Sequence, residues 1–219
     1  MKTNLPTLIL LAGMPGVGKS TTAVRLAALL NLAVVVGTDE IRDVMRLYDK
    51  SEALAGTSHD RWQIFGALDS LSFKQGYLAH SSAIRPGVMA IINKNLALGE
   101  SLIIEGVHLA PSLYQHLPRA QICHCLLYLS SAELHRRNLD SKTKRRLGYK
   151  PAWSQQLARH VVRVQDHLLT EAKHFRVLAM ESGSAEQNAR TIINHLKAEE
   201  RHKYVPNYPR QDYALQPLC

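Results

Sequence analysis

One short segment of the chain combines glycines, a lysine and a hydroxyl group in a spacing that can bind phosphate. Residues 13–20 read Gly-Met-Pro-Gly-Val-Gly-Lys-Ser and match the pattern G-x-x-x-x-G-K-[ST] completely. Glycines in such a loop let successive backbone N–H groups surround a phosphate, and the helix that follows adds its positive end. The spacing predicts that Lys19 bridges the β- and γ-phosphates of ATP and that Ser20 ligates Mg²⁺. The predicted ATP-binding residues are Gly13, Gly16, Val17, Gly18, Lys19, Ser20 and Thr21.

A carboxylate and two arginines follow the second apolar segment of the chain. Residues 36–46 read Val-Gly-Thr-Asp-Glu-Ile-Arg-Asp-Val-Met-Arg, so Arg42 and Arg46 share a helix face with Asp39. A carboxylate here can accept a proton from a substrate hydroxyl or hold a Mg²⁺-bound water. Guanidinium groups suit the capture of a carboxylate or phosphate. We expect all three residues to bind substrate and Asp39 to be catalytic. The alternative is that Asp39 caps the helix and the arginines form a solvated face.

The third apolar segment ends in an acidic residue, with a glycine and a histidine close behind. In Leu-Ile-Ile-Glu-Gly-Val-His, residues 102–108, Glu105 occupies the position that holds Mg²⁺ or orients a nucleophile in enzymes with a phosphate loop. We therefore predict Glu105 as a catalytic and metal-binding residue. His108 either contacts substrate or caps a short helix over Pro111–Leu117, and the sequence favours neither role over the other.

Most of the excess positive charge lies in one short segment. The chain carries 27 Lys+Arg against 18 Asp+Glu, and residues 131–150 alone hold seven basic and two acidic residues. We expect a lid in which Arg137 is catalytic and closes over the transferring phosphate. A solvated helix or an RNA-binding stripe is the alternative, although aromatic residues that could stack on bases are sparse here. The predicted lid residues are Arg136, Arg137, Lys144 and Arg145.

Composition excludes several other classes of protein. A chain of 219 residues with 46% hydrophobic residues can build one sizeable domain and is too apolar to be disordered. The run Leu8–Ala12 is too short to span a bilayer, so no membrane association is expected. Three cysteines, with Cys123 and Cys125 alternating in an apolar run, favour core packing in a reducing cytoplasm over a disulfide framework. Zinc binding by these two thiols is a weaker alternative.

Strands and helices must alternate to position these residues. Hydrophobic period predicts strands at residues 5–12, 33–36, 102–104, 122–129 and 175–180. It predicts helices at residues 19–30, 40–48, 87–98, 186–199, from Ser130 or Ser131 into the basic segment, and from Pro151 through Ala172. This order indicates an α/β fold with a doubly wound, five-stranded parallel sheet, whose ligands bind at the carboxyl ends of the strands. We expect one domain over residues 1–200, with 49–80 as a substrate-side insertion, 131–150 as the lid and 201–219 as an extended tail.

Three stretches together resemble the P-loop domain of the 2-phosphoglycerate kinase family: residues 13–20, residues 37–46, and Ile-Ile-Glu-Gly-Val-His-Leu-Ala-Pro at 103–111. Val-Gln-Asp-His-Leu at 164–168, with Glu171 and Ala172, is similar to a late helix of the family, so the likeness covers roughly residues 5–198. The resemblance implies a P-loop NTPase fold of the nucleoside-monophosphate-kinase type. It also implies ATP- and Mg²⁺-dependent phosphoryl transfer to the hydroxyl of a small phosphorylated acid, from 2-phosphoglycerate to 2,3-bisphosphoglycerate. Residues 57–62 only echo the family's corresponding stretch.

Two other functions stay open from the sequence. The excess charge permits a nucleic-acid-end kinase or an RNA-associated nucleotide-binding protein. The departure of residues 49–80 from the family permits a regulator that binds ATP without catalysis. A small anionic metabolite is the partner that the residue pattern favours.

Overall fold

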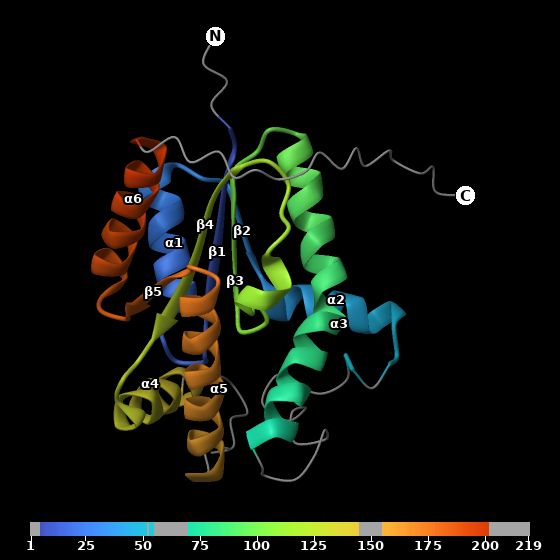
Figure 1. Cartoon of the computed structure of the whole chain (residues 1–219), viewed down its shortest axis with the longest axis vertical. Helices are drawn as coiled ribbons and strands as arrows, with labels where there is room; N and C mark the ends of the chain where they lie inside the picture. Colours follow the sequence, from blue (N-terminus) through green and yellow to red (C-terminus); the bar gives the residue numbers. More distant parts are fainter. Residues whose placement is uncertain (1–4, 52, 55–69, 145–154, 202–219) are drawn as a thin grey trace.

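The protein is built around a parallel sheet whose most apolar strand lies at its centre. The computed structural model describes residues 5–51, 53–54, 70–144 and 155–201. The five strands pair in parallel in the order β2-β3-β1-β4-β5 (Figure 1). They are β1 (Thr7–Gly13), β2 (Val34–Gly37), β3 (Leu102–Gly106), β4 (Gln121–Tyr128) and β5 (Leu178–Glu181). This is the doubly wound, nucleoside-monophosphate-kinase type of sheet that the sequence predicts.

Helices cover both faces of this sheet. Figure 1 shows α1 and α6 packed together on one face, with α3 and α5 on the other. The remaining helical elements follow the carboxyl ends of strands: α2 follows β2, a 3₁₀ turn η2 follows β3, and α4 follows β4. Their bounds are α1 (Lys19–Leu30), α2 (Thr38–Tyr48), α3 (Ser70–Ala97), η2 (Pro111–Tyr114), α4 (Ala132–Lys144), α5 (Gln155–His174) and α6 (Ala185–Arg201).

The central strand explains why the core forms where it does. All four side chains from Leu8 to Leu11 are fully buried, because β1 has a strand on each side and helices on both faces. A continuous apolar run, rather than an alternating one, is the pattern of a strand buried in this way. Each buried leucine or isoleucine contributes about 1.5–3 kcal/mol relative to an exposed one. The rigid sheet thus holds the loop that follows Gly13.

Helix α3 is longer than the sequence predicts. Residues 87–98 were expected to be helical, but the helix begins at Ser70 and continues through Pro86 to Ala97. Burial of Ile84, Val88 and Ile92 along one side of α3 stabilises the helix across the proline. Residues 70–80, expected to belong to an insertion, are helical as the first turns of α3, and the substrate-side role of 49–80 stays a prediction. Residues 55–69 lie outside the described residues.

Smaller differences concern the turn after β3 and the first turns of two helices. The helix expected over Pro111–Leu117 is only a 3₁₀ turn ending at Tyr114. Helix α2 has no side-chain cap, because it begins at Thr38 and its N-cap is Gly37. The start expected for α4, at Ser130 or Ser131, is confirmed, since Ser131 Oγ caps the helix by accepting a hydrogen bond from the Leu134 N–H at 3.2 Å.

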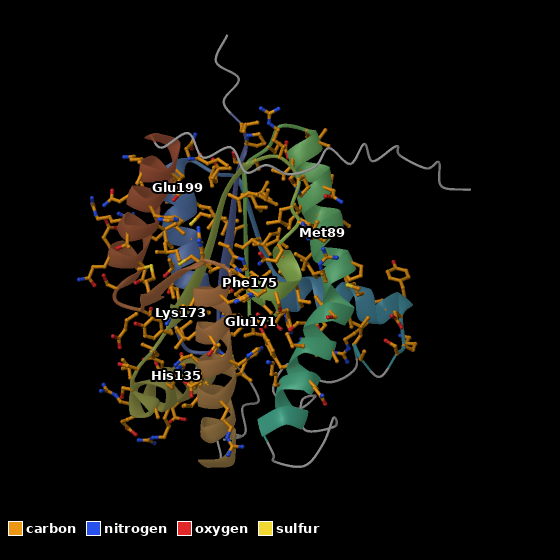
Figure 2. The ribbon with its side chains drawn as sticks, in the orientation of Figure 1. Met89, His135, Glu171, Lys173, Phe175 and Glu199 are labelled. Atoms are coloured by element: carbon orange, nitrogen blue, oxygen red, sulfur yellow. The ribbon has the colours of Figure 1, made fainter. Side chains whose placement is uncertain are left out.

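The turn after β3 is fixed by a buried carboxylate. Glu171 of α5 (Figure 2) accepts hydrogen bonds from the Ser112 N–H at 3.0 Å and from Ser112 Oγ at 2.9 Å. His167 Nε2 lies 3.0 Å from Oε1, the carboxylate oxygen that also accepts from Ser112 Oγ. Burial opposes ionisation of Glu171, but hydrogen bonds from His167 and Ser112 hold the pKa of the carboxyl below its usual value. Helix α5 is thereby tied to the segment that follows Glu105 and His108.

The cysteines of β4 are core residues, as predicted. Cys123 and Cys125 are both buried with reduced thiols, and burial raises the pKa of the Cys123 thiol to about 12. Neither thiol therefore ionises readily at neutral pH. Among the described residues, no helix is both long enough and apolar enough to cross a membrane.

Candidate functional site

The loop between β1 and α1 has a backbone that only glycine adopts easily. Gly13, Gly16 and Gly18 have φ angles of 145°, 85° and 86°. A side chain at Gly13 would overlap the carbonyl oxygen of Leu127, and one at Gly16 would lie 2.9 Å from Leu139. Conformation and close packing both require glycine here, so the spacing in the sequence reflects the geometry of the loop.

The carbonyl groups of this loop are bound by protein donors. Lys19 Nζ donates to Met14 O at 3.0 Å, and Asn138 Nδ2 of α4 donates to Gly16 O at 2.9 Å. Thr21 Oγ1 donates to Gly18 O at 2.8 Å. Because these carbonyl groups already accept hydrogen bonds from the protein, the N–H groups of the loop can point toward an anion. The loop and the start of α1 thus have the backbone geometry that the motif predicts, and phosphate binding there stays a prediction.

The two predicted metal ligands lie side by side. Ser20 is at the start of α1 and Glu105 near the end of β3, and Ser20 Oγ donates to Glu105 Oε1 at 2.7 Å. Both line an open depression of about 440 Å³, so their oxygens are accessible. A hydroxyl and a carboxylate oxygen are the hard donors that Mg²⁺ prefers. The residues present therefore fit a magnesium ion beside the loop.

Asp39 lies at the neighbouring strand end and is held by a buried arginine. Its carboxylate is 58% exposed, and Oδ1 is 3.0 Å from Nη1 of Arg42, whose side chain is only 7% exposed. The same guanidinium lies 3.0 Å from Asp43, which also pairs with Arg46 at 3.4 Å. Arg42 is therefore placed beneath Asp39 and supports it, instead of extending into solvent as a direct ligand for substrate. Arg46 is 41% exposed and can reach an anion.

A second buried contact fixes the start of α2. Thr38, fully buried just before Asp39, shares a 2.7 Å hydrogen bond between Oγ1 and His108 Nδ1. Gly106 makes room for this contact, because a side chain there would overlap Thr38. Burial, with His80 nearby, lowers the pKa of His108 to about 3, so the imidazole is neutral at neutral pH. His108 thus neither lines the accessible surface nor caps η2, and both predicted roles give way to positioning Thr38.

Replacing Thr38 with valine is expected to lower the free energy of unfolding by about 1–3 kcal/mol. Valine has nearly the same shape but leaves the buried His108 nitrogen without its hydroxyl partner. Urea denaturation measures the change. Thr170→Val is the control, because the Thr170 hydroxyl is exposed and bonds to Asp166 O of its own helix. Equal stability of the two variants would contradict the assigned contact.

The basic segment forms α4, which begins directly after β4. Arg136 is paired with Glu133 at 2.6 Å and with Asp140 at 3.5 Å, so its charge is partly neutralised within the helix. Arg137 is exposed on the same helix. The Lys144 side chain and the whole of Arg145 lie outside the described residues. The closing lid remains a prediction for which Arg137 is the best-placed residue.

Helix α4 is fastened to the sheet and to the phosphate loop by polar groups. His135, labelled in Figure 2, bonds through Nε2 to Gln165 Oε1 of α5 at 2.9 Å. Gln165 in turn clamps the backbone of Leu129, with its amide donating to Leu129 O at 2.8 Å and its oxygen accepting from Leu129 N at 3.0 Å. Together with the hydrogen bond from Asn138 Nδ2 to Gly16 O, these bonds hold α4 against the phosphate loop.

Sequence reasoning missed several of these supporting residues. Nothing in the local pattern around Asn138 points to Gly16, which is 122 positions away. Gln165 had a signal, because it lies in the stretch of residues 164–168 that is similar to the family's late helix. Thr38 precedes Asp39, and its sequence neighbourhood gives no signal for a contact with His108, 70 positions away.

Comparison with known proteins agrees with this geometry. Residues 8–146 match a family model described as an AAA domain. The chain is 30% identical to 2-phosphoglycerate kinase of Pyrococcus furiosus over 203 residues, covering 89% of this chain and 65% of the relative. It is 35% identical to the Methanocaldococcus jannaschii enzyme of the same name over 136 residues, covering 60% and 44%. This chain therefore spans only about half to two thirds of the length of these relatives.

Solved structures share the fold. Shikimate kinase from Acinetobacter baumannii in complex with shikimate matches with a TM-score of 0.53 and 16% identity, covering 92% of this chain and 96% of the other. A gluconokinase from Sinorhizobium meliloti 1021 gives a TM-score of 0.53 and 16% identity over 94% and 99%. The phosphate loop, the order of the strands and the family model agree: the sequence is similar to 2-phosphoglycerate kinases, and the chain belongs to the AAA domain family.

Proposed function

We propose that the protein transfers the γ-phosphoryl group of ATP to a hydroxyl group of a small phosphorylated carboxylic acid, with 2-phosphoglycerate as the favoured acceptor. The observation that carries the proposal is the placement of three groups at or just after the carboxyl ends of the adjacent strands β2, β3 and β1. Ser20 follows the loop after β1, Glu105 lies on β3 within 2.7 Å of it, and Asp39 follows β2. Anion-binding amides, metal ligands and a carboxylate that can act as a base are the parts that phosphoryl transfer requires.

The proposed step moves one phosphoryl group and one proton. The acceptor oxygen bonds to the γ-phosphorus of ATP while the bond from that phosphorus to the leaving oxygen of ADP breaks. Asp39 takes the proton of the acceptor hydroxyl, and Lys19 stabilises negative charge on the phosphates. Arg137 closes over the transferring group. Ser20 and Glu105 would hold a magnesium ion, which would neutralise charge on the phosphate oxygens.

The class of acceptor is argued from charge and from the relatives. Arg46 offers a half-exposed guanidinium on the same helix as Asp39, which suits a carboxylate or phosphate group. Besides the 2-phosphoglycerate kinases, the chain is 27% identical over 136 residues to mevalonate-3-phosphate 5-kinase of Thermoplasma acidophilum, covering 62% of this chain. Both named acceptors carry a hydroxyl, a carboxylate and a phosphate. An acceptor with these three groups is therefore the best expectation.

Transfer of ³²P from γ-labelled ATP to a panel of acceptors tests the proposal. The panel contains 2-phosphoglycerate, 3-phosphoglycerate, mevalonate-3-phosphate, glycerate and shikimate, with water as the blank. We expect a labelled product that depends on Mg²⁺, with the highest kcat/KM for an acceptor that has both carboxylate and phosphate. Transfer only to unphosphorylated acceptors would contradict the acceptor class. Tight, salt-dependent binding of short RNA without transfer to any of these acids would contradict the kinase assignment.

A further inference from the structure

The segment after β5 reaches back to the phosphate loop. Ser182 Oγ, in the connection between β5 and α6, donates a hydrogen bond to the carbonyl oxygen of Val17 at 2.6 Å, across 165 positions of sequence. We propose that Ser182, held by Asn188, is a positioning residue that sets the orientation of the Val17–Gly18 peptide for nucleotide phosphate binding. Neither residue belongs to the phosphate-loop motif, and neither contacts the acceptor side of the site in this proposal.

The connection that carries Ser182 is itself fixed at each residue. The Ser182 N–H donates to Tyr128 O at 2.8 Å, and the Gly183 N–H donates to Asn188 Oδ1 at 2.9 Å. Ser184 forms a reciprocal cap with Gln187: its N–H donates to Gln187 Oε1 at 2.9 Å, and its Oγ accepts from Gln187 N–H at 3.2 Å. These hydrogen bonds fix the backbone of residues 182–184 before any ligand binds. They therefore also fix the position of the Ser182 hydroxyl.

Asn188 determines which way the Ser182 hydroxyl points. Asn188 is 1% exposed, and its Nδ2 group donates to Ser182 Oγ at 3.0 Å and to Thr22 Oγ1 of α1 at 3.1 Å. A serine hydroxyl has one hydrogen to donate. Because its oxygen already accepts from Asn188, that hydrogen is directed at Val17 O. The amide also joins α6 to the first turn of α1, which carries Ser20.

The peptide geometry turns this contact into an effect on the loop. In a planar trans peptide the C=O and the N–H of the next residue point in opposite directions. Holding Val17 O toward Ser182 therefore directs the Gly18 N–H away from Ser182, toward the inside of the loop where a phosphate binds. Gly18 has a φ of 86°, a conformation that the adjacent peptide must preserve. Without the serine hydroxyl, the Val17–Gly18 peptide can rotate. The Gly18 N–H then points toward the phosphate for only part of the time.

Titration of the full chain with Mg·ATP and Mg·ADP, by isothermal calorimetry, tests the proposal without an acceptor. Ser182→Ala is expected to weaken both affinities roughly tenfold, the size of one lost hydrogen bond. Ser182→Thr keeps the hydroxyl and is expected to bind within about twofold of the parent. Ser184→Ala is the matched control, because it removes the cap of α6 two residues away without touching the loop. Melting temperatures of all variants report folding.

The outcomes separate positioning from general stability. Weak binding by Ser182→Ala, normal binding by Ser184→Ala and rescue by Ser182→Thr support the proposal, even where the two alanine variants melt alike. Equal nucleotide affinity of Ser182→Ala and the parent overturns it, as does an equal loss in Ser184→Ala. Since no acceptor is present, failure of the proposed acceptor class leaves these measurements unaffected.

Discussion

Replacing Lys19 with alanine is expected to lower kcat/KM for phosphoryl transfer by about 10²–10³-fold. The side chain is 8% exposed, and its Nζ lies across the loop, 3.0 Å from Met14 O. From there the ammonium group can reach phosphate oxygens, where charge develops in the transition state. Loss of one such preorganised donor costs about 2.7–4 kcal/mol of barrier. The fold should persist, because alanine is an excellent helix former at the first position of α1.

Initial rates with the best acceptor of the panel measure this change, and circular dichroism confirms the fold. Lys94→Ala serves as the control. Lys94 is an exposed lysine in the last turn of α3, which ends shortly before the amino end of β3. That variant should keep its activity within about twofold, as surface substitutions usually do. If Lys19→Ala retained the parent rate at saturating ATP, the phosphate loop would not be the catalytic nucleotide site.

The sheet could be predicted because its signals are local. The run from Leu8 to Leu11 is apolar at each position, and burial on both faces is the only environment that suits such a strand. The phosphate loop is equally local, since its glycines, Lys19 and Ser20 are consecutive and their spacing encodes the turn. The alternation of strands and helices along the chain then places the phosphate loop and Asp39 at the same edge of the sheet, where the strands have their carboxyl ends.

Helix α3 could not be predicted in full, because local and tertiary preferences disagree there. Pro86 normally ends or kinks a helix, and Gly87 weakens one. In the folded chain, Gly87 lets α2 approach, since a side chain there would meet Met45 and Ile41. The packing that compensates for both residues exists only once α2 and α3 are together.

The burial of the site residues could not be predicted from the sequence either. Arg42 was predicted as a ligand, and His108 as either a ligand or a helix cap, yet both are buried. Arg42 bonds to Asp39 and Asp43, while His108 bonds to Thr38. The types and spacing of the residues identify which groups lie at one edge of the sheet. How deeply each side chain is buried depends on how α2 packs. In this structure the two residues support neighbouring groups of α2, and their contact with substrate stays a prediction.

Replacing Asp39 with asparagine is expected to lower kcat by about 10²–10⁴-fold, the usual contribution of a general base. Asparagine keeps an oxygen that can accept from Arg42 Nη1, so the helix and its buried arginine should stay in place. It lacks the basicity to take a proton from the acceptor hydroxyl. Because the proposed site for the phosphates of ATP is the loop after β1, affinity for Mg·ATP should change by less than about twofold.

Asp43→Asn is the matched control for this experiment. Asp43 also pairs with Arg42, through a 3.0 Å contact, and lies on the same helix with nearly the same exposure, 59% against 58%. The two variants therefore make the same change of charge beside the same guanidinium. A loss of kcat confined to Asp39→Asn identifies a base, since an electrostatic effect through Arg42 would appear in both. Equal losses would instead mean that the carboxylates act only by holding Arg42, and the base would have to be sought elsewhere at the carboxyl edge of the sheet.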